Sequence, residues 1–269
     1  MNHESSSVLI GPNEALVCLA AHGVSEFLST LLLLLTVMGG YAAFIAPAGQ
    51  GWIPSIQLAL LVGATIALIA SSPLGKLSGA HMNPAVSLAF WLQGRMDFAE
   101  FLVYALGQFG GAMVACGLLT FLLPGPFQTV GFGVLSPVAA ENAVKIVVLE
   151  GAATAGLISV LFYTLSHKNM TRYAPLALAV YLAAVTFALA TVTGASFNPA
   201  RAYGAAVVAQ QLIGQWPYAV APIIGAATVV MMCRLVSWLP RPLYHRLNHS
   251  HRHRNYTWSK VQEWFRLSV

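Results

Sequence analysis

The chain has 269 residues, of which 58% are hydrophobic and 8% are charged, and its formal net charge is +5. Because soluble domains are about a quarter charged, this composition excludes an ordinary water-soluble fold and indicates that lipid covers much of the surface. The basic excess is concentrated in the C-terminal tail, and no basic patch interleaved with aromatic residues occurs elsewhere, so nucleic acid is not an expected partner.

Six apolar segments are long enough to cross a bilayer, which takes about 20 residues of helix. The first segment is too long for the apolar core of a cleaved signal peptide and is expected to be a retained span. Composition and segment length together predict an all-α membrane protein with six transmembrane helices. We place these helices near residues 15–41, 54–72, 98–122, 143–166, 174–193 and 216–238.

Two further apolar segments are only roughly ten residues long and are too short to span a bilayer. Each begins with Asn-Pro. Asparagine is a preferred helix N-cap, and proline at the first helical position gives up an N–H that would have no partner there anyway. The pattern therefore predicts two half-membrane helices, which begin at Asn83-Pro84-Ala85 and at Asn198-Pro199-Ala200.

The chain repeats internally, with one glutamate and one Asn-Pro-Ala segment in each half. Glu26 and Asn83 mark the first half, and Glu150 and Asn198 mark the second. The two asparagines lie 115 residues apart (198 − 83). Each half has three spans, an odd number, so the second half must be inverted relative to the first. Inverted repeats with broken helices at matching places indicate a solute site near the middle of the membrane.

The distribution of charge predicts the orientation. The loops near 42–53 and 123–142 contain no lysine or arginine, whereas most basic residues fall on the opposite side if there are six spans. The positive-inside rule then places both termini in the cytoplasm, and we expect a multi-pass protein of the plasma (cell inner) membrane. The expected units are a cytoplasmic N-terminal segment (1–14), a membrane domain (15–238) with repeats 15–122 and 143–238, and a basic cytoplasmic tail (239–269).

Half-helices that enter from opposite faces would bring their N-termini together near the middle of the membrane. Each N-terminus carries about half a positive charge, and two such ends beside one narrow passage disfavour cations, including hydronium. The side-chain carbonyls of Asn83 and Asn198 would cap the helices while their NH₂ groups face the lumen as donors. The two Asn-Pro-Ala segments are therefore the expected central constriction of a pore.

The two segments resemble the signature loops of the aquaporin, or major intrinsic protein, family. They read SGAHMNPAVS at 78–87 and TGASFNPAR at 193–201, and the resemblance runs from about residue 20 to 238. It implies that 15–238 is an aquaporin-like channel domain for passive flow of water or small uncharged solutes, with protons and ions excluded. It also implies no cofactor and a homotetramer in the lipid bilayer, with one pore in each subunit.

Arg201 lies one turn into the second short helix, and a permanently charged group at membrane depth indicates function. Its five N–H donors can bind a neutral solute while its charge repels a cation. The resemblance implies that this arginine lies in the narrowest constriction, the selectivity filter, toward the outer side. Matching by position adds Thr186, Ala195 and either Val62 or Gly63 to the filter.

These filter positions leave the identity of the solute open. Family members selective for water usually place phenylalanine and histidine among them, and neither occurs here. Small residues opposite Arg201 favour a wider opening that passes glycerol, urea or neutral metalloid hydroxides besides water. The glycerol-facilitator branch, however, usually has aspartate directly after this arginine, and here the residue is Ala202.

Three titratable residues are expected to support the two loops. By resemblance, Glu26 and Glu150 accept hydrogen bonds from the loops, with a proton relay as the alternative role. His81 is expected to brace the first loop, with gating by pH as the alternative. For the whole protein, an ion-coupled secondary transporter is the alternative function, because inverted repeats and broken helices occur there too.

The remaining features predict little chemistry. No nucleophile with a nearby base and no nucleotide-binding loop is visible, so an enzyme is not expected. The tail has four histidines, at 245, 249, 251 and 253, whose spacing specifies no metal geometry, so no metal site is expected. Residues 256–267 place aromatic residues at helical spacing, which fits either an amphipathic helix on anionic lipid or a solvated tail.

Overall fold

The six predicted spans are helices. The computed structural model describes residues 12–49, 51–135, 140–236 and 239–243, and the histidine-rich tail lies outside the described residues. Within the described residues, six helices are long and apolar enough to cross a membrane, which confirms the prediction. They are α1 (Pro12–Gly40), α2 (Trp52–Ser71), α5 (Phe98–Leu122), α7 (Ala140–Ser166), α8 (Ala174–Thr193) and α10 (Pro217–Leu235).

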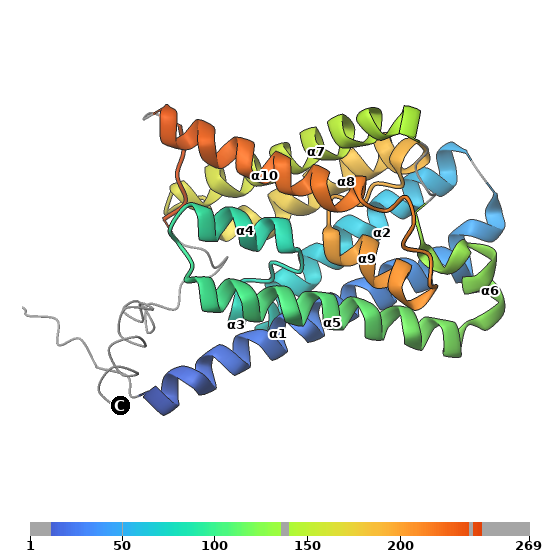
Figure 1. Cartoon of the computed structure of the whole chain (residues 1–269), viewed down its shortest axis with the longest axis horizontal. Helices are drawn as coiled ribbons and strands as arrows, with labels where there is room; N and C mark the ends of the chain where they lie inside the picture. Colours follow the sequence, from blue (N-terminus) through green and yellow to red (C-terminus); the bar gives the residue numbers. More distant parts are fainter. Residues whose placement is uncertain (1–11, 50, 136–139, 237–238, 244–269) are drawn as a thin grey trace, which may run out of the picture.

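The two short helices that the Asn-Pro pairs predict are also present. They are α4 (Pro84–Leu92) and α9 (Pro199–Val208), and they lie end to end in the middle of the bundle (Figure 1). The sequence did not predict the further short helices and turns at the ends of the bundle. These are η1 (Tyr41–Ile45), η2 (Ala46–Ala48), α3 (Pro73–Ser78), α6 (Pro124–Thr129), η3 (Gly131–Gly133) and η4 (Thr171–Tyr173).

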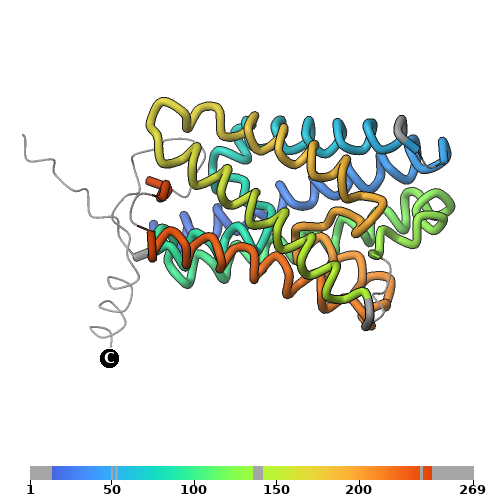
Figure 2. The backbone as a smooth tube through the Cα atoms, turned by 90° about the horizontal axis from the view of Figure 1, so that it is seen from above, coloured from blue at the N-terminus to red at the C-terminus, as the bar shows by residue number. Residues whose placement is uncertain are grey.

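The two halves of the chain pack in matching ways. In the first half α1 packs against α5, and in the second α7 packs against α10, while α2 and α8 pack against each other between the halves. Each half-helix also contacts the last span of the other half, α4 against α10 and α9 against α5. The halves are therefore interlocked, and the start of α1 and the end of α10 lie at the same end of the bundle (Figure 2).

Glycines allow the paired spans to approach at backbone distance. A Cβ atom at Gly111 of α5 would lie 2.3 Å from the carbonyl oxygen of Phe27 in α1. A Cβ atom at Gly225 of α10 would lie 2.2 Å from the carbonyl oxygen of Gly151 in α7. Small residues at helix contacts are typical of membrane bundles, where close packing replaces the hydrophobic effect as the source of association.

The outer surface of the bundle is apolar. Large hydrophobic side chains project from it with little cover, such as Phe44, Phe121 and Leu106, which are 82%, 81% and 73% exposed. Water-soluble monomers rarely expose apolar patches of this extent, so the surface is suited to lipid. Several polar side chains are instead buried inside the bundle, among them Glu26, Glu150, Asn83 and Asn198.

Candidate functional site

The site is built around the N-termini of the two half-helices. The Asn83 side-chain oxygen accepts a hydrogen bond from the backbone N–H of Ala85 at 2.9 Å. The Asn198 side-chain oxygen accepts from the N–H of Ala200 at 2.9 Å and from that of Arg201 at 3.3 Å. Both asparagines thus cap their helices as the sequence predicted, with proline in the first helical turn in each case.

The two caps are joined to each other. The Asn83 amide donates a hydrogen bond to the carbonyl oxygen of Phe197 at 2.8 Å, and the Asn198 amide donates to that of Met82 at 2.7 Å. From the sequence we expected both NH₂ groups to face the lumen, but one N–H of each binds the opposite loop instead. An amide nitrogen carries two hydrogens. Both asparagines also line the cavity, so one N–H of each is available for that role.

The loops before the half-helices share an unusual backbone. Ala80 and Met82 in the first loop have φ values of 52° and 49°, and Ala195 and Phe197 in the second have 47° and 49°. Left-handed conformations cost roughly 1–2 kcal/mol at a residue other than glycine, so they persist only where surrounding contacts determine them. The same cost at matching positions in both loops indicates that the same backbone shape is imposed twice.

Glu26 holds the first loop in this shape. Its carboxylate, which is fully buried in α1, accepts hydrogen bonds from four donors. These are the Ser78 hydroxyl at 2.6 Å, the backbone N–H groups of His81 at 2.9 Å and Met82 at 2.7 Å, and the Gln108 amide at 2.7 Å. A buried carboxylate with this many donors is well compensated for the loss of water.

Glu150 does the same for the second loop from α7. It accepts from the Thr193 hydroxyl at 2.6 Å and from the backbone N–H groups of Ser196 at 3.1 Å and Phe197 at 2.6 Å. These three donors lie 115 positions after three of the donors to Glu26. The second carboxylate has no described counterpart of the Gln108 bond, which is the first difference between the halves.

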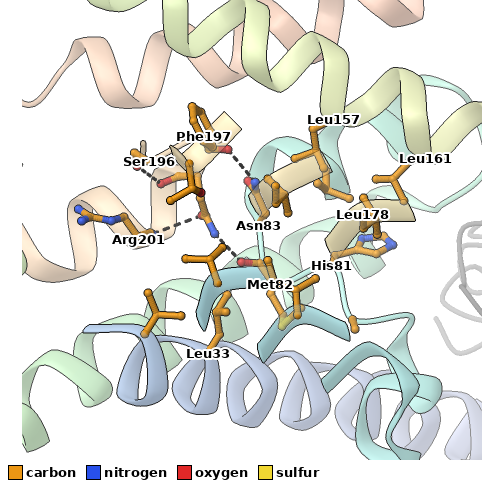
Figure 3. A pocket seen from close by; sticks show the side chains of 18 of the residues that line it. Leu33, His81, Met82, Asn83, Leu157, Leu161, Leu178, Ser196, Phe197 and Arg201 are labelled. Carbon is orange, nitrogen blue, oxygen red and sulfur yellow. Dashed lines mark hydrogen bonds between the residues drawn. The ribbon is translucent and has the colours of Figure 1, made fainter. Parts of the chain in front are cut away.

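A cavity of about 120 Å³ runs past both loops. Much of its wall is apolar and comes from the spans, with Leu33, Leu157, Leu161 and Leu178 among the side chains that face it (Figure 3). The rest includes the loop residues around Met82, Asn83, Phe197 and Asn198 and also Arg201. The hydrogen-bonding groups therefore come mainly from the loops and Arg201, with Thr186 of α8 as an exception on the spans.

Four of the five residues proposed for the filter line this cavity. Gly63 does not, because it packs against α8, where an added Cβ would lie 2.8 Å from the carbonyl oxygen of Ala179. Of the two alternatives in the second span, the structure therefore turns Val62 to the cavity and Gly63 to the helix interface. The lining residues of the proposed filter are Val62, Thr186, Ala195 and Arg201.

Arg201 is anchored by a segment that the sequence analysis missed. Its guanidinium donates a hydrogen bond from Nη1 to the carbonyl oxygen of Gly133 at 3.0 Å. Gly131, Phe132 and Gly133 have φ values of 60°, 56° and 70°, so this turn is left-handed throughout. The Gly-Phe-Gly sequence was the available signal for such a turn, but nothing local in it indicated a partner 68 residues away.

His81 lies at the cavity wall beside the first loop. Its Nδ1 is 3.0 Å from the hydroxyl oxygen of Ser87, and its ring stacks on that of Phe90 with 4.9 Å between centroids. These contacts fit the bracing role that the sequence predicted, and pH gating stays a hypothesis. The ring also lies 5.1 Å from that of Tyr104 between centroids, so His81 contacts both α4 and α5.

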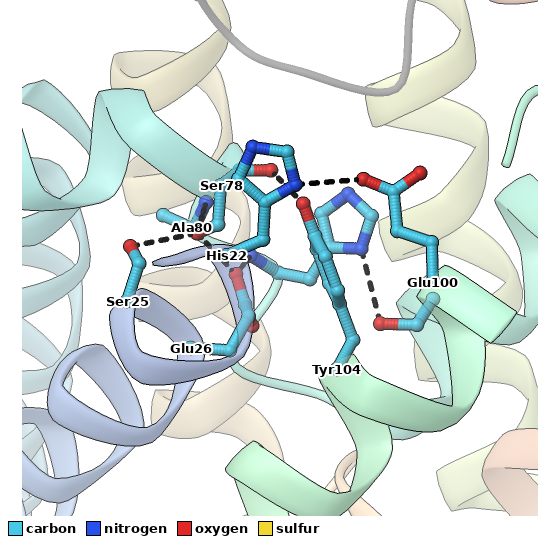
Figure 4. Close-up of polar contacts among 9 residues, drawn as sticks. His22, Ser25, Glu26, Ser78, Ala80, Glu100 and Tyr104 are labelled. Carbon is cyan, nitrogen blue, oxygen red and sulfur yellow. Dashed lines mark hydrogen bonds and ion pairs between the residues drawn. The ribbon is translucent and has the colours of Figure 1, made fainter. Parts of the chain in front are cut away.

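A polar cluster lies behind the first loop and was not predicted (Figure 4). His22 and Glu100 pair at 3.1 Å between Nδ1 and Oε1. The Tyr104 hydroxyl donates to the carbonyl oxygen of Ser78 at 2.6 Å, and the Ser25 hydroxyl donates to that of Leu74, also at 2.6 Å. The cluster ties α1, α3 and α5 together underneath the loop.

Comparison with known proteins gives one family. The family model described as "Major intrinsic protein" matches residues 16–232. Aquaporin TIP1-2 of Zea mays is 31% identical over 228 residues, which cover 83% of this chain and 88% of that protein. Aquaporin TIP1-2 of Musa acuminata is 33% identical, over 78% of this chain and 83% of that protein.

More distant similarity agrees. Aquaporin-1 of Pongo abelii is 30% identical over 217 residues, which cover 78% of this chain and 79% of that protein. The solved structure of the aquaglyceroporin from Plasmodium falciparum superposes with a TM-score of 0.65 at 21% identity, over 82% of this chain and 97% of that one. At that identity the structural likeness concerns the fold alone.

Proposed function

The chain belongs to the major intrinsic protein family, and we propose that its pore passes larger uncharged solutes such as glycerol or urea in addition to water. Family membership makes the protein an integral, multi-pass membrane channel for passive flow of water and small solutes, and not an enzyme. The comparisons give no support to the alternative of an ion-coupled transporter. The open question is which solutes pass.

The proposal depends on the residues that face Arg201 across the cavity. Val62, Thr186 and Ala195 are small or medium-sized, and no aromatic side chain is among them. A solute with several hydroxyl or amide groups can bind the Arg201 guanidinium while its carbon skeleton lies against the apolar side of the wall. A narrow aromatic filter would exclude such a solute by size.

The central constriction is proposed to exclude protons and cations. Asn83 and Asn198 bring the N-terminal ends of α4 and α9 together through two hydrogen bonds. Each end contributes about half a positive charge, which disfavours a cation between them. One N–H of each asparagine is left to bind a passing oxygen atom, while Pro84, Ala85, Pro199 and Ala200 form the rest of the two motifs.

We further propose a homotetramer with one pore per subunit, in the plasma (cell inner) membrane with both termini in the cytoplasm. The apolar outer surface supports contact with lipid or with other copies of the chain. The lack of lysine and arginine near 42–53 and 123–142 supports the orientation by the positive-inside rule. Cross-linking of the purified protein tests the tetramer, and cysteine labelling of intact cells tests the orientation.

The test of the solute proposal is stopped-flow permeability of proteoliposomes to water, glycerol, urea and boric acid. The wild-type protein should pass water and at least one larger solute, and Arg201→Ala should raise the flux of larger solutes severalfold relative to water. Val86→Ala is the matched control, because Val86 lies 115 positions before Arg201 and also lines the cavity. A wild-type channel that passes water alone would refute the wide filter. An unaltered selectivity in Arg201→Ala would refute the filter assignment.

A further inference from the structure

The carbonyl that anchors Arg201 belongs to a short segment with its own supports. Gly133 presents its oxygen to the guanidinium from the left-handed turn η3. Two residues later the chain reaches Leu135, whose side chain is 4% exposed. The position of Arg201 depends on the position of this acceptor. Contacts that hold the segment in place therefore also hold the arginine in place.

Gln215 binds this segment from the connection between α9 and α10. Its side-chain amide donates a hydrogen bond from Nε2 to the carbonyl oxygen of Leu135 at 2.8 Å. The Gln215 side chain is fully buried, and its Oε1 has no hydrogen-bond partner among the described residues. Burying an amide that makes so few bonds is costly, and such groups call for an explanation in function.

The Leu135 side chain forms the second support. It belongs to a small apolar cluster with Ile146, Ala202 and Tyr218, which come from α7, α9 and α10. It also fills the space beside Gly194, where an added Cβ would lie 2.3 Å from its Cδ2 atom. Leu135 is therefore clamped between the residue after Arg201 and the start of the second pore loop.

We propose that Gln215 is a positioning residue for the selectivity of the pore, acting on Arg201 through Leu135 and the turn at Gly133. The inference rests on the proposed place of Arg201 in the filter. Without the Gln215 donor, the Leu135 oxygen is left without this bond inside the protein, and the segment moves to find another donor. Gly133 moves with it and draws the guanidinium away from the lumen, which widens the passage for larger solutes.

The test is Gln215→Met in the full-length protein, with water and glycerol permeability measured in proteoliposomes. Methionine keeps the length of the side chain and removes the donor. We expect the glycerol-to-water permeability ratio to rise about threefold, because one neutral hydrogen bond shifts an equilibrium by roughly two- to twelvefold. Gln215→His, which restores an N–H donor at similar reach, should bring the ratio back toward that of the wild type.

Gln211→Met is the matched control, because Gln211 is an exposed glutamine of the same connection, and its ratio should equal that of the wild type. If the methionine variant does not fold, Gln215→Asn replaces it, since its amide is one methylene too short to reach Leu135. In an Arg201→Ala background, Gln215→Met should leave the ratio unchanged.

Two results would overturn the proposal. One is a Gln215→Met ratio that stays the same or falls while Arg201→Ala alone raises it. The other is a rise that persists undiminished in the Arg201→Ala background, since the effect would then not pass through the arginine. If Arg201→Ala itself has no effect, it is the filter assignment that fails, so the two failures are distinguishable.

Discussion

The two pore loops, 79–83 and 194–198, have the same internal structure but different surroundings. Each has left-handed backbone at matching positions, each is held by one buried glutamate, and each ends in an asparagine that caps a half-helix and binds the other loop. These shared parts form the region where the loops meet. The barrier to cations that we propose there requires both loops, and neither loop has a special role in it.

The differences lie just outside the loops. The first loop has additional support from Gln108 and Tyr104, and the position 115 residues before Arg201 is Val86. Among the described residues the second loop has no counterpart of these two hydrogen bonds, but its half-helix carries Arg201, which donates a hydrogen bond to Gly133. We propose that the duplicated contacts make the barrier to cations. In our proposal, contacts that occur in one half of the chain only determine which solutes pass, and those that do so lie beside the second loop.

The largest expected effect is a loss of stability that differs between glutamine variants of Glu26 and Glu150, because the two carboxylates accept different numbers of hydrogen bonds. The Oε2 atom of Glu26 accepts from Met82 and Gln108, whereas among the described residues that of Glu150 accepts from Phe197 alone. A glutamine at either position replaces one carboxylate oxygen by an NH₂ group, which cannot accept a hydrogen bond. Each buried donor that loses its acceptor in this way costs about 1–3 kcal/mol. Glu26→Gln should therefore lower the free energy of unfolding by about 4 kcal/mol and Glu150→Gln by about 2 kcal/mol.

Unfolding in mixed detergent micelles measures both variants. Ser159→Ala is a suitable control on α7, because its exposed hydroxyl binds the helix's own backbone at Ala155 and its loss should change the free energy by less than about 0.5 kcal/mol. Equal losses for the two glutamine variants would show that the Gln108 bond adds nothing and that the loops are supported alike.

Local patterns sufficed to predict the duplicated parts from the sequence. Asn-Pro followed by a short apolar run gives the caps and the half-helices, and apolar length gives the spans. The glutamates were assigned by resemblance, and the structure shows the bonds that this implied. The choice between Val62 and Gly63 was open, because it depends on which of two neighbours faces the α8 backbone, and packing rather than pattern decides that.

The single-copy parts could not be predicted for a physical reason. Gln215 and Leu135 lie 80 residues apart and Arg201 and Gly133 lie 68 apart, with no periodicity that relates them. A loop residue that binds a backbone carbonyl has no sequence constraint on its partner, since every residue offers a carbonyl. The His22 and Glu100 pair was missed likewise, because each looks like an isolated polar residue near the end of a span.

The next effect tests the symmetry of the caps. Asn83→Ala and Asn198→Ala each remove an N-cap, worth about 1 kcal/mol, and one hydrogen bond between the loops, worth about 1 kcal/mol more. Each should lower the free energy of unfolding by about 2 kcal/mol, with the two values agreeing to within about 0.5 kcal/mol. Unfolding in the same micelles measures both free energies. A clear difference between the two values would show that one loop determines the conformation of the other.

The smallest effect should come from the supports of the first loop. Tyr104→Phe removes the hydroxyl that binds the Ser78 carbonyl and leaves the ring in place, so the free energy of unfolding should fall by about 1 kcal/mol. The glycerol-to-water permeability ratio should not change, because this hydroxyl binds the last residue of α3, just before the first loop, and not the Arg201 side of the pore. A shift of that ratio in Tyr104→Phe as large as in Gln215→Met would contradict the division of roles between the halves, since supports of either loop would then control which solutes pass.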